Sequence, residues 1–217
     1  MSKKIISIEG NIGVGKSTFV SILKNTIDNS EGVYEPVDMW KNLKDSNEEN
    51  ILHKFYKDTE RWAYSFQNLA CITRMMKIEE KIKLSDAEFL FCDRSLGTDK
   101  HVFEKMLYDT KKISEIEHKM YNLWYDFYHK YIRPESNNAI IYLRCNPETA
   151  YKRIQKRGRE EEKNISLEYL NDLHRYHEDW LMTESNVLVI NCDRDFENDK
   201  EYQQQVINDI KLFTNKL

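Results

Sequence analysis

The phosphate loop at residues 10–17 (Gly-Asn-Ile-Gly-Val-Gly-Lys-Ser) restricts the fold of this chain more than any other feature. It matches the pattern Gly-x-x-x-x-Gly-Lys-Ser/Thr, follows an apolar run at residues 5–8 and opens a helical pattern. A strand must deliver such a loop, and a helix must begin at its end so that free N–H groups and the helix dipole can hold a phosphate. The chain is therefore expected to adopt an α/β fold and to bind a nucleoside triphosphate.

The positions within the loop have distinct chemical roles. Its glycines let the backbone curl so that successive N–H groups point inward, Lys16 can reach the β- and γ-phosphates, and Ser17 can bind Mg²⁺. The expected ATP-binding residues of this segment are Gly10, Asn11, Gly13, Gly15, Lys16, Ser17 and Thr18.

Strand patterns alternate with helix patterns along the whole chain. Apolar strands are predicted at residues 5–8, 32–35, 89–93, 139–143 and 187–191, and amphipathic helices at 59–84, 113–132, 147–157 and 166–182. This alternation favours a five-stranded parallel sheet with right-handed crossovers and helices on both faces. Ligands in such sheets bind beyond the carboxyl ends of the strands, where the loop, Glu35 and Asp93-Arg94-Ser95 fall. With no repeat or proline-rich linker, residues 1–217 are expected to form a single domain.

Composition limits the compartments and the classes of partner that are expected for the protein. The formal net charge is −4, whereas a nucleic-acid binder usually has a net basic face. No apolar run approaches the roughly 20 residues that span a bilayer, and the first predicted strand leaves no room for a leader peptide. The four cysteines lie far apart, so reduced core residues are expected. We expect a cytoplasmic protein without nucleic-acid or membrane partners.

The rest of the sequence separates the classes of phosphate-loop protein. A GTPase would carry Asn-Lys-x-Asp, which the sequence lacks. A motor ATPase would place a glutamate after Asp93, but Arg94 follows, and an arginine suits an anionic substrate or transition state. The charge-rich segment at about residues 157–164 is expected to form a lid, with Arg153, Arg157 and Arg159 stabilising charge on the transferred group. A solvated helix face is the alternative for each arginine.

Glu35 is the best candidate for a general base. It lies at the end of a predicted strand, and Pro36 restricts its backbone to an extended or turn form. A carboxylate within hydrogen-bond reach of an acceptor hydroxyl can take its proton. An ordinary acid at a strand end explains the pattern equally well.

Short islands of sequence carry further information. They are Glu35-Pro36-Val37 with Trp40, Glu60-Arg61-Trp62, Ser65-Phe66-Gln67, Ala70-Cys71 with Arg74, Asp93-Arg94-Ser95 with Asp99, Ile141-Tyr142-Leu143, Pro147-Glu148-Thr149, Arg153-Ile154 through Arg157-Gly158-Arg159 to Glu162, Leu167-Glu168-Tyr169-Leu170 and Asp195-Phe196. In this order they resemble the deoxynucleoside kinase family, in particular its deoxycytidine kinase and deoxyguanosine kinase branch. The resemblance implies a P-loop kinase that transfers the γ-phosphoryl group of ATP, with Mg²⁺, to the 5′-hydroxyl of a deoxynucleoside.

The resemblance also implies a role for each matching residue. Glu35 would deprotonate the 5′-hydroxyl, and Arg94 would contact that hydroxyl and the moving phosphoryl group. The other implied positions are Tyr56 and Glu162 at the sugar 3′-hydroxyl, Gln67 at the base edge, Trp40, Phe66 and Phe103 as pocket walls, Lys16, Arg153, Arg157 and Arg159 around the donor phosphates, Asp195 and Phe196 at the adenine, and Ser17 and Asp93 at Mg²⁺. Asp93 stands where the family usually has glutamate, so a direct or a water-mediated metal contact stays open.

Arg74 and Asp99 bear on the choice of base. In the family, an Arg/Asp pair goes with deoxycytidine and purine deoxynucleosides, and such a pair would fill the room that a thymine methyl needs. A purely structural ion pair is the alternative. Gly97 stands where deoxycytidine kinase has a bulkier residue, so an enlarged pocket for purines is expected. Deoxycytidine, deoxyadenosine and deoxyguanosine are the expected acceptors, with thymidine least favoured.

Aromatic residues and two histidines on predicted helices have structural interpretations, and two other functions stay open. Aromatic residues at Tyr121, Trp124, Tyr125, Phe127, Tyr128 and Tyr131 are expected in the core or at a dimer surface, and the resemblance supports a homodimer. His174 and His177 are interpreted as part of a surface face rather than as metal ligands. A nucleoside-monophosphate kinase and a non-catalytic ATP-binding module are the alternative functions.

Overall fold

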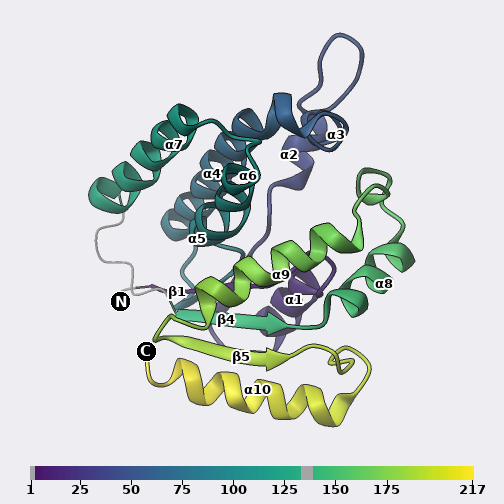
Figure 1. Ribbon diagram of the computed structural model, residues 1–217. Helices are drawn as coiled ribbons and strands as arrows, with labels where there is room; N and C mark the ends of the chain where they lie inside the picture. The colour runs from purple at the N-terminus through teal and green to yellow at the C-terminus, as the bar shows by residue number, and fades with distance from the viewer. Residues whose placement is uncertain (1–2, 133–138) are drawn as a thin grey trace.

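The computed structural model describes residues 3–132 and 139–217. Within these residues, five parallel strands form one sheet in the order β2-β3-β1-β4-β5 (Figure 1). The strands are β1 (Lys4–Glu9), β2 (Ser30–Val33), β3 (Phe89–Asp93), β4 (Ala139–Arg144) and β5 (Val187–Asn191). β1 is central, because Ile6 lies opposite Phe91 of β3 on one side and Ala139 of β4 on the other. The sheet confirms the predicted α/β fold.

Helices connect the strands and cover both faces of the sheet. They are α1 (Lys16–Thr26), α2 (Val37–Asn42), α3 (Ile51–Lys57), α4 (Thr59–Leu84), α5 (Leu96–Thr98), η1 (Asp99–Glu104), α6 (Lys105–Asp109), α7 (Glu115–Phe127), η2 (Tyr128–Ile132), α8 (Pro147–Arg157), η3 (Glu160–Glu162), α9 (Leu167–Leu181) and α10 (Lys200–Thr214). Residues 96–109 run without a break through η1, a π-helical turn. Such turns often occur at functional sites, and η1 carries Asp99 and Phe103.

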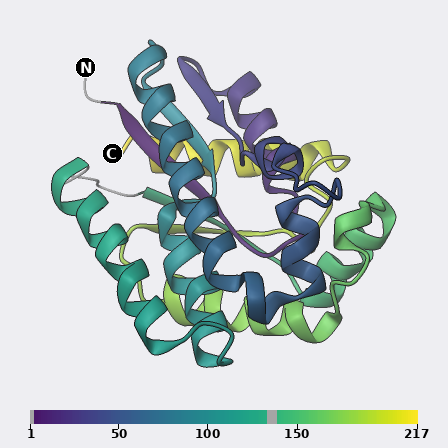
Figure 2. The same cartoon turned by 90° about the horizontal axis from the view of Figure 1, so that it is seen from above.

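Alternation along the strands gives each face of the sheet its own apolar layer. Ile6 and Ile8 of β1 pack in one cluster with side chains of α1 and α10. Leu90 and Cys92 of β3 pack instead against Ile78 of α4. Seen from above, α4 lies over the sheet, beside the teal helices that follow it in the chain (Figure 2). The layers fix the carboxyl ends of the strands in one place, where a site can be assembled.

Local signals set most helix bounds. The Asp58 side chain accepts a hydrogen bond from the N–H of Arg61, so α4 begins at the predicted residue. Pro147 lies in the first turn of α8, and Gly158, with a φ of +66°, ends it. A capping box formed by Ser114 and Glu117 starts α7 two residues later than predicted.

Two expectations about individual residues were wrong. β2 ends at Val33, so Glu35 lies in the connection beyond the strand rather than at its last position. His177 is fully buried and not part of a surface face. Its Nδ1 lies 2.6 Å from the carbonyl oxygen of Leu173, one turn earlier in α9, which explains how the ring is accommodated.

The cysteines follow the prediction, since Cys71, Cys92, Cys145 and Cys192 are all buried and form no disulfide. In the part of the chain that the structure describes, no helix combines the length and the apolar character needed to cross a membrane.

Candidate active site

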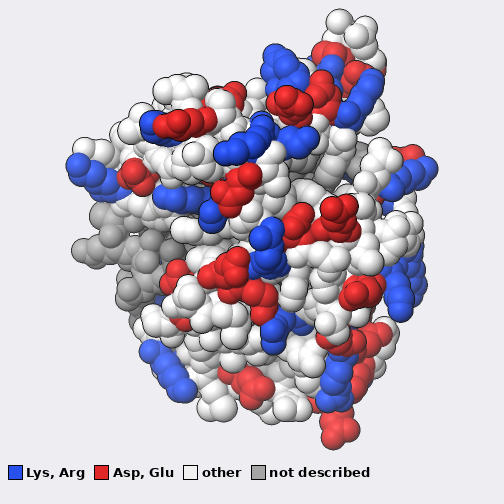
Figure 3. Space-filling model, in the orientation of Figure 1, with Lys and Arg blue, Asp and Glu red and all other residues white. Residues whose placement is uncertain are grey.

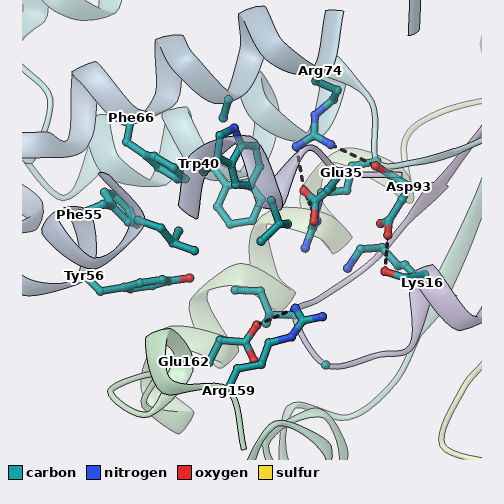
Figure 4. Close-up of a pocket in the computed structure, with 18 of the residues that line it drawn as sticks. Lys16, Glu35, Trp40, Phe55, Tyr56, Phe66, Arg74, Asp93, Arg159 and Glu162 are labelled. Carbon is teal, nitrogen blue, oxygen red and sulfur yellow. Dashed lines mark hydrogen bonds and ion pairs between the residues drawn. The ribbon is translucent and has the colours of Figure 1, made fainter. Parts of the chain in front are cut away.

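A cavity of about 250 Å³ opens beyond the carboxyl ends of β1, β2 and β3 (Figure 4). Most of the predicted site residues line it: Gly13, Gly15, Lys16, Ser17, Thr18, Glu35, Trp40, Tyr56, Phe66, Gln67, Arg74, Asp93, Arg94, Asp99, Phe103, Arg157, Arg159 and Glu162. The predicted residues outside its lining are Gly10, Asn11, Arg153, Asp195 and Phe196. The chain thus brings together polar groups from segments that are far apart in sequence.

The phosphate loop has the backbone that its glycines allow. Gly15 has a φ of +101° and precedes the first residue of α1. At Gly10, a Cβ atom would lie 2.5 Å from the carbonyl oxygen of Leu143, so only glycine fits. The loop therefore approaches β4 closely. It ends at the first turn of α1, whose first N–H groups have no partner within the helix.

Lys16 is held by the loop that it belongs to. Its Nζ donates hydrogen bonds to the carbonyl oxygens of Gly10 (3.1 Å) and Asn11 (2.8 Å). Burial and the nearby charge of Arg94 lower the pKa of Lys16 to about 7. An anionic phosphate would favour the charged ammonium, so the site is suited to that ligand.

Three of the predicted donor-site residues support the loop from outside the cavity. Asn11 donates its side-chain N–H to the carbonyl oxygen of Leu170 over 2.8 Å. Arg153 donates to the carbonyl oxygen of Val14 over 3.3 Å. The buried ring of Phe196 packs edge-on against that of Phe19, with centroids 5.2 Å apart. The exposed carboxylate of Asp195 accepts hydrogen bonds from its own turn.

Ser17 and Asp93 form a site suited to a divalent cation. The Ser17 hydroxyl donates to Oδ2 of Asp93 over 2.6 Å. Oδ1 of Asp93 is buried and has no hydrogen-bond partner among the described residues. Mg²⁺ prefers oxygen ligands and is usually bound by one or two carboxylates together with substrate phosphates. The described residues contain no cluster of three or more His, Cys, Asp or Glu that could hold a metal ion by itself.

Arg74 joins the carboxylates of Asp99 and Glu35 in the lining of the cavity, and Figure 4 shows it beside Glu35. It donates to Asp99 through Nε (2.8 Å) and Nη2 (3.2 Å), and Nη2 also donates to Glu35 over 2.8 Å. A third nitrogen, Nη1, donates to the carbonyl oxygen of Asp93 over 3.0 Å. Both Arg74 and Asp99 are almost completely buried, and each of the three guanidinium nitrogens of Arg74 donates at least one hydrogen bond.

Arg94 approaches Glu35 from the other side. Its Nε lies 3.3 Å from Oε1 of Glu35, and its Nη1 donates to the carbonyl oxygen of Gly10 over 3.0 Å. The guanidinium stacks over the ring of Phe103 at 4.9 Å from the centroid. Arg94 has a φ of +70°, a conformation that non-glycine residues adopt rarely and that is often retained at functional sites.

These cations decide the charge of Glu35. Burial alone would raise the pKa of this carboxyl, but the positive charges of Arg74, Arg94 and Lys16 outweigh that effect and lower the pKa to about 2. Glu35 is therefore ionised at neutral pH and presents a hydrogen-bond acceptor at the edge of the cavity.

Aromatic rings line the outer part of the cavity. The rings of Phe55 and Phe66 stack with centroids 4.7 Å apart, and Trp40 meets Phe66 edge-on at 5.3 Å. The Trp40 indole N–H donates to the hydroxyl of Thr73 over 3.0 Å, which fixes its orientation. Gln67 lies buried among these rings, and its Oε1 has no partner in the described part of the chain. The amide is thus available to an aromatic ligand that presents a polar edge.

The predicted lid forms the connection between α8 and α9. Arg157 donates to Glu162 through Nη2 over 2.5 Å and through Nε over 3.2 Å, and Arg159 donates to the same carboxylate over 3.4 Å. Figure 4 shows Glu162 and Arg159 on the side of the cavity opposite Arg74. The lid therefore places two arginines and one acid over the cavity mouth.

Sequence reasoning missed some lining residues and misplaced one. Phe55 and Tyr169 line the cavity but were not predicted as site residues, although Phe55 precedes Tyr56 and Tyr169 belongs to one of the quoted islands. Gly97 does not line the cavity, which corrects the expectation of a larger base pocket. A Cβ atom there would lie 2.6 Å from the Trp180 ring, so Gly97 makes room for α9.

Comparisons with known proteins agree with this geometry. The sequence profile of the deoxynucleoside kinase family matches residues 6–215. The chain is 36% identical to deoxycytidine kinase 2 of Gallus gallus, covering 96% of this chain and 89% of that protein. It is 35% identical to deoxycytidine kinase of Homo sapiens (99% and 92%) and 32% identical to mitochondrial deoxyguanosine kinase of Xenopus laevis (98% and 90%). The chain therefore belongs to the deoxynucleoside kinase family and is an ATP-dependent kinase of deoxynucleosides.

Proposed function

We propose that this kinase transfers the γ-phosphoryl group of ATP to the 5′-hydroxyl of deoxycytidine, of deoxyadenosine or deoxyguanosine, or of several of these. The observation that carries the proposal is the position of Glu35, ionised between Arg74 and Arg94, where an apolar cavity meets the phosphate loop. The similar proteins named deoxycytidine kinase and deoxyguanosine kinase support this choice of acceptor.

In the proposed mechanism, catalysis rests mainly on positioning and charge. Glu35 accepts the hydrogen bond of the 5′-hydroxyl and takes its proton as the new P–O bond forms. Its low pKa makes it a weak base, but a loose phosphoryl-transfer transition state needs little proton removal before bond formation. Lys16 and Arg94, together with Arg157 and Arg159, stabilise negative charge on the donor and on the transferred group.

Residues of the outer cavity would hold the nucleoside. Gln67 would pair with the base edge between the rings of Trp40 and Phe66, while Tyr56 and Glu162 would hold the 3′-hydroxyl of the sugar. Burial, reinforced by the negative charges of neighbouring groups that include Glu162 and Glu35, raises the pKa of Tyr56, so its hydroxyl remains a donor at neutral pH. The Arg74–Asp99 pair occupies the depth of the pocket, which favours bases without a thymine methyl.

Mg²⁺ would be held by Ser17 and Asp93 together with the donor phosphates, and it would supply charge neutralisation of the triphosphate. The support for this assignment is the unpaired Oδ1 of Asp93 beside the Ser17 hydroxyl. Asn11, Arg153, Asp195 and Phe196 would act on the donor indirectly, by fixing the phosphate loop and the turn beside it.

The test is kcat/KM with ATP and Mg²⁺ for the four natural deoxynucleosides, with thymidylate as a further acceptor. We expect turnover of deoxycytidine or a purine deoxynucleoside, with thymidine at least about 100-fold poorer because a buried ion pair must move to admit it. Thymidine preference would refute the proposed base selection. Turnover of thymidylate alone would instead indicate a nucleoside-monophosphate kinase, and ATP binding without any turnover would indicate a non-catalytic module.

We also propose a homodimer built on α7. Exposed apolar side chains recur along this helix and η2: Ile116, Met120, Leu123, Trp124, Phe127 and Tyr131. Tyr121 and Tyr128, on the other side, are buried. An apolar stripe of this kind usually marks an interface.

A charge placed in the proposed interface should reduce the mass of the protein in solution to that of a monomer. Leu123→Glu should place a charge in the interface and give a monomer by sedimentation. Leu212→Glu, at a leucine of similar exposure on α10, should leave the dimer intact. A Leu123→Glu protein that sediments as a dimer would exclude this face.

We place the kinase in the cytoplasm, where four buried cysteines that form no disulfide remain reduced. No nucleic-acid partner is proposed. On the face shown in Figure 3, lysine and arginine side chains are interspersed with aspartate and glutamate, unlike a basic strand-binding surface.

A further inference from the structure

Glu9, the last residue of β1, is a fully buried carboxyl group that neither the phosphate loop nor the acceptor site uses directly. One of its oxygens accepts a hydrogen bond from the hydroxyl of Thr98, and the side chain also bonds to Ser95. Its second oxygen has no partner among the described residues. Burying a carboxyl group is costly, and burial raises the pKa of Glu9. A residue with this cost invites a functional explanation.

The residues on either side of Glu9 both bind Arg94. The carbonyl oxygen of Ile8 accepts from the backbone N–H of Arg94 over 3.0 Å, and that of Gly10 accepts from its guanidinium over 3.0 Å. The Gly10 carbonyl also accepts from Lys16. The end of β1 thus touches both cations that face the donor phosphates in the proposed function.

Arg94 needs such support because its backbone is strained. With a φ of +70°, it is held in a conformation that is costly for a non-glycine residue and persists only when its surroundings enforce it. Ile8 and Gly10 hold Arg94 itself, and Glu9 holds the following residues through Ser95 and Thr98. Three consecutive residues therefore fix the corner at residues 94–98.

We propose that Glu9 is a positioning residue, which holds this corner through Ser95 and Thr98 so that the Arg94 guanidinium points at Glu35 and the transferred phosphoryl group. This role rests on the proposed function of Arg94. Glu9 touches no substrate and transfers no proton; its carboxyl oxygen acts only as a hydrogen-bond acceptor. A side chain that serves only packing would not affect Arg94 selectively.

Substitutions distinguish a positioning role of Glu9 from a role in packing alone. Glu9→Leu removes the acceptor at similar volume and should lower kcat about 30-fold, since small misplacements of a catalytic group have large effects on rate. Glu9→Gln keeps an acceptor oxygen and should restore kcat to within about three-fold of the wild-type value, and Thr98→Val should cost about five-fold. The KM for the deoxynucleoside should change little. Ser7→Ala is the matched control, because Ser7 is also buried in β1 and its hydroxyl has no partner among the described residues.

A double-mutant cycle tests whether the effect passes through Arg94. In an Arg94→Ala background, Glu9→Leu should lower kcat by less than about two-fold, because the group that it positions is gone. An equal loss in both backgrounds, or a Glu9→Gln protein as slow as Glu9→Leu, would overturn the inference. Thermal unfolding of each variant ensures that rates are compared between folded proteins.

A measurement without turnover keeps this inference distinct from the proposed function. The Nε–H NMR signal of Arg94, assigned by its loss in Arg94→Lys, should be sharp and slowly exchanging in the wild type and in Glu9→Gln but broadened in Glu9→Leu. An unchanged signal in Glu9→Leu would refute the positioning role even if the wild type phosphorylated no deoxynucleoside. Absence of wild-type turnover would refute the proposed function alone.

Discussion

Replacement of Glu35 by glutamine is expected to lower kcat by about 10³-fold while ATP affinity stays within about three-fold of the wild-type value. The amide keeps nearly the size of the carboxylate and an acceptor oxygen, but it cannot take the proton of the acceptor hydroxyl. It also leaves Arg74 and Arg94 without the anion that now lies between them. The measurement is steady-state kcat with saturating deoxycytidine or a purine deoxynucleoside, together with ATP binding at equilibrium.

Glu31→Gln is the matched control for that variant. Glu31 also belongs to the β2 region, but it pairs with Lys81 and does not line the cavity. This substitution should leave kcat within about two-fold of wild type, as is usual for a surface ion pair. A Glu35→Gln enzyme with near-normal kcat would show that the base has been misassigned.

The second large effect is expected at the Arg74–Asp99 pair. Arg74→Met alone should destabilise the protein by about 3–5 kcal/mol, because it leaves Asp99 as an unpaired buried acid. Adding Asp99→Ala removes that acid and should recover part of the loss. The double variant should also gain thymidine turnover relative to deoxycytidine by at least about 100-fold, since about 3 kcal/mol of ion-pair rearrangement is no longer required.

Two measurements check these effects. Denaturant unfolding of both single variants and the double variant tests the stability order, and kcat/KM for each base tests the specificity. Lys77→Met is a suitable control, because Lys77 forms an exposed ion pair with Glu80 on the same helix. Unchanged relative kcat/KM values across the bases would make Arg74 and Asp99 a structural pair without influence on specificity.

The same double variant should alter the pH dependence of the reaction. In the wild type, the pKa of Glu35 is lowered from its ordinary 4.5 to about 2 by Arg74, Arg94 and Lys16 acting against burial. A depressed pKa stabilises the folded protein above pH 4.5, and that stabilisation is lost as the pH falls toward 2. Loss of Arg74 raises the pKa of Glu35, so more of the carboxyl is protonated in weak acid.

The observable is the ratio of variant to wild-type kcat/KM for deoxycytidine, in which the ionisation of ATP cancels. This ratio should fall as the pH is lowered from about 7 to about 5, because only the variant protonates Glu35 in that range. A ratio that does not change with pH would mean that Arg94 and Lys16 suffice to keep Glu35 ionised.

Much of the fold could be predicted because its signals are local. The strand at residues 89–93 follows from its apolar run, and the phosphate loop and the bounds of α4 and α8 follow from glycine, proline and capping residues close in sequence. The end of β2 was misplaced by two residues because Tyr34 and Glu35 follow Val33 directly, before Pro36, but do not continue the pairing with β3. Short helices such as α2 and α3 have too few turns to show a clear period.

The predicted site likewise contains residues with a local sequence signal and contacts that depend on residues far away in sequence. Residues with a charged or glycine signature, such as Lys16 and Arg94, were identified before their neighbours were known. The shared contacts of Arg74 depend on residues 25 and 39 positions away in sequence, which no local pattern reveals. The buried Glu9 escaped notice because a single acid at a strand end resembles a solvated one, and Gly97 was misread because only the fold places Trp180 against it.

Because one guanidinium contacts both Asp99 and Glu35, the pair proposed to limit the accepted bases also sets the charge of the proposed general base. The range of accepted nucleosides and the speed of the enzyme are therefore expected to change together. A substitution of Arg74 that widens the range of accepted bases is expected to give a slower or more acid-sensitive enzyme. A second substitution that restores a positive charge near Glu35 without filling the pocket again should then recover the rate. In this chain, promiscuity and turnover are expected to evolve in pairs of substitutions rather than one at a time.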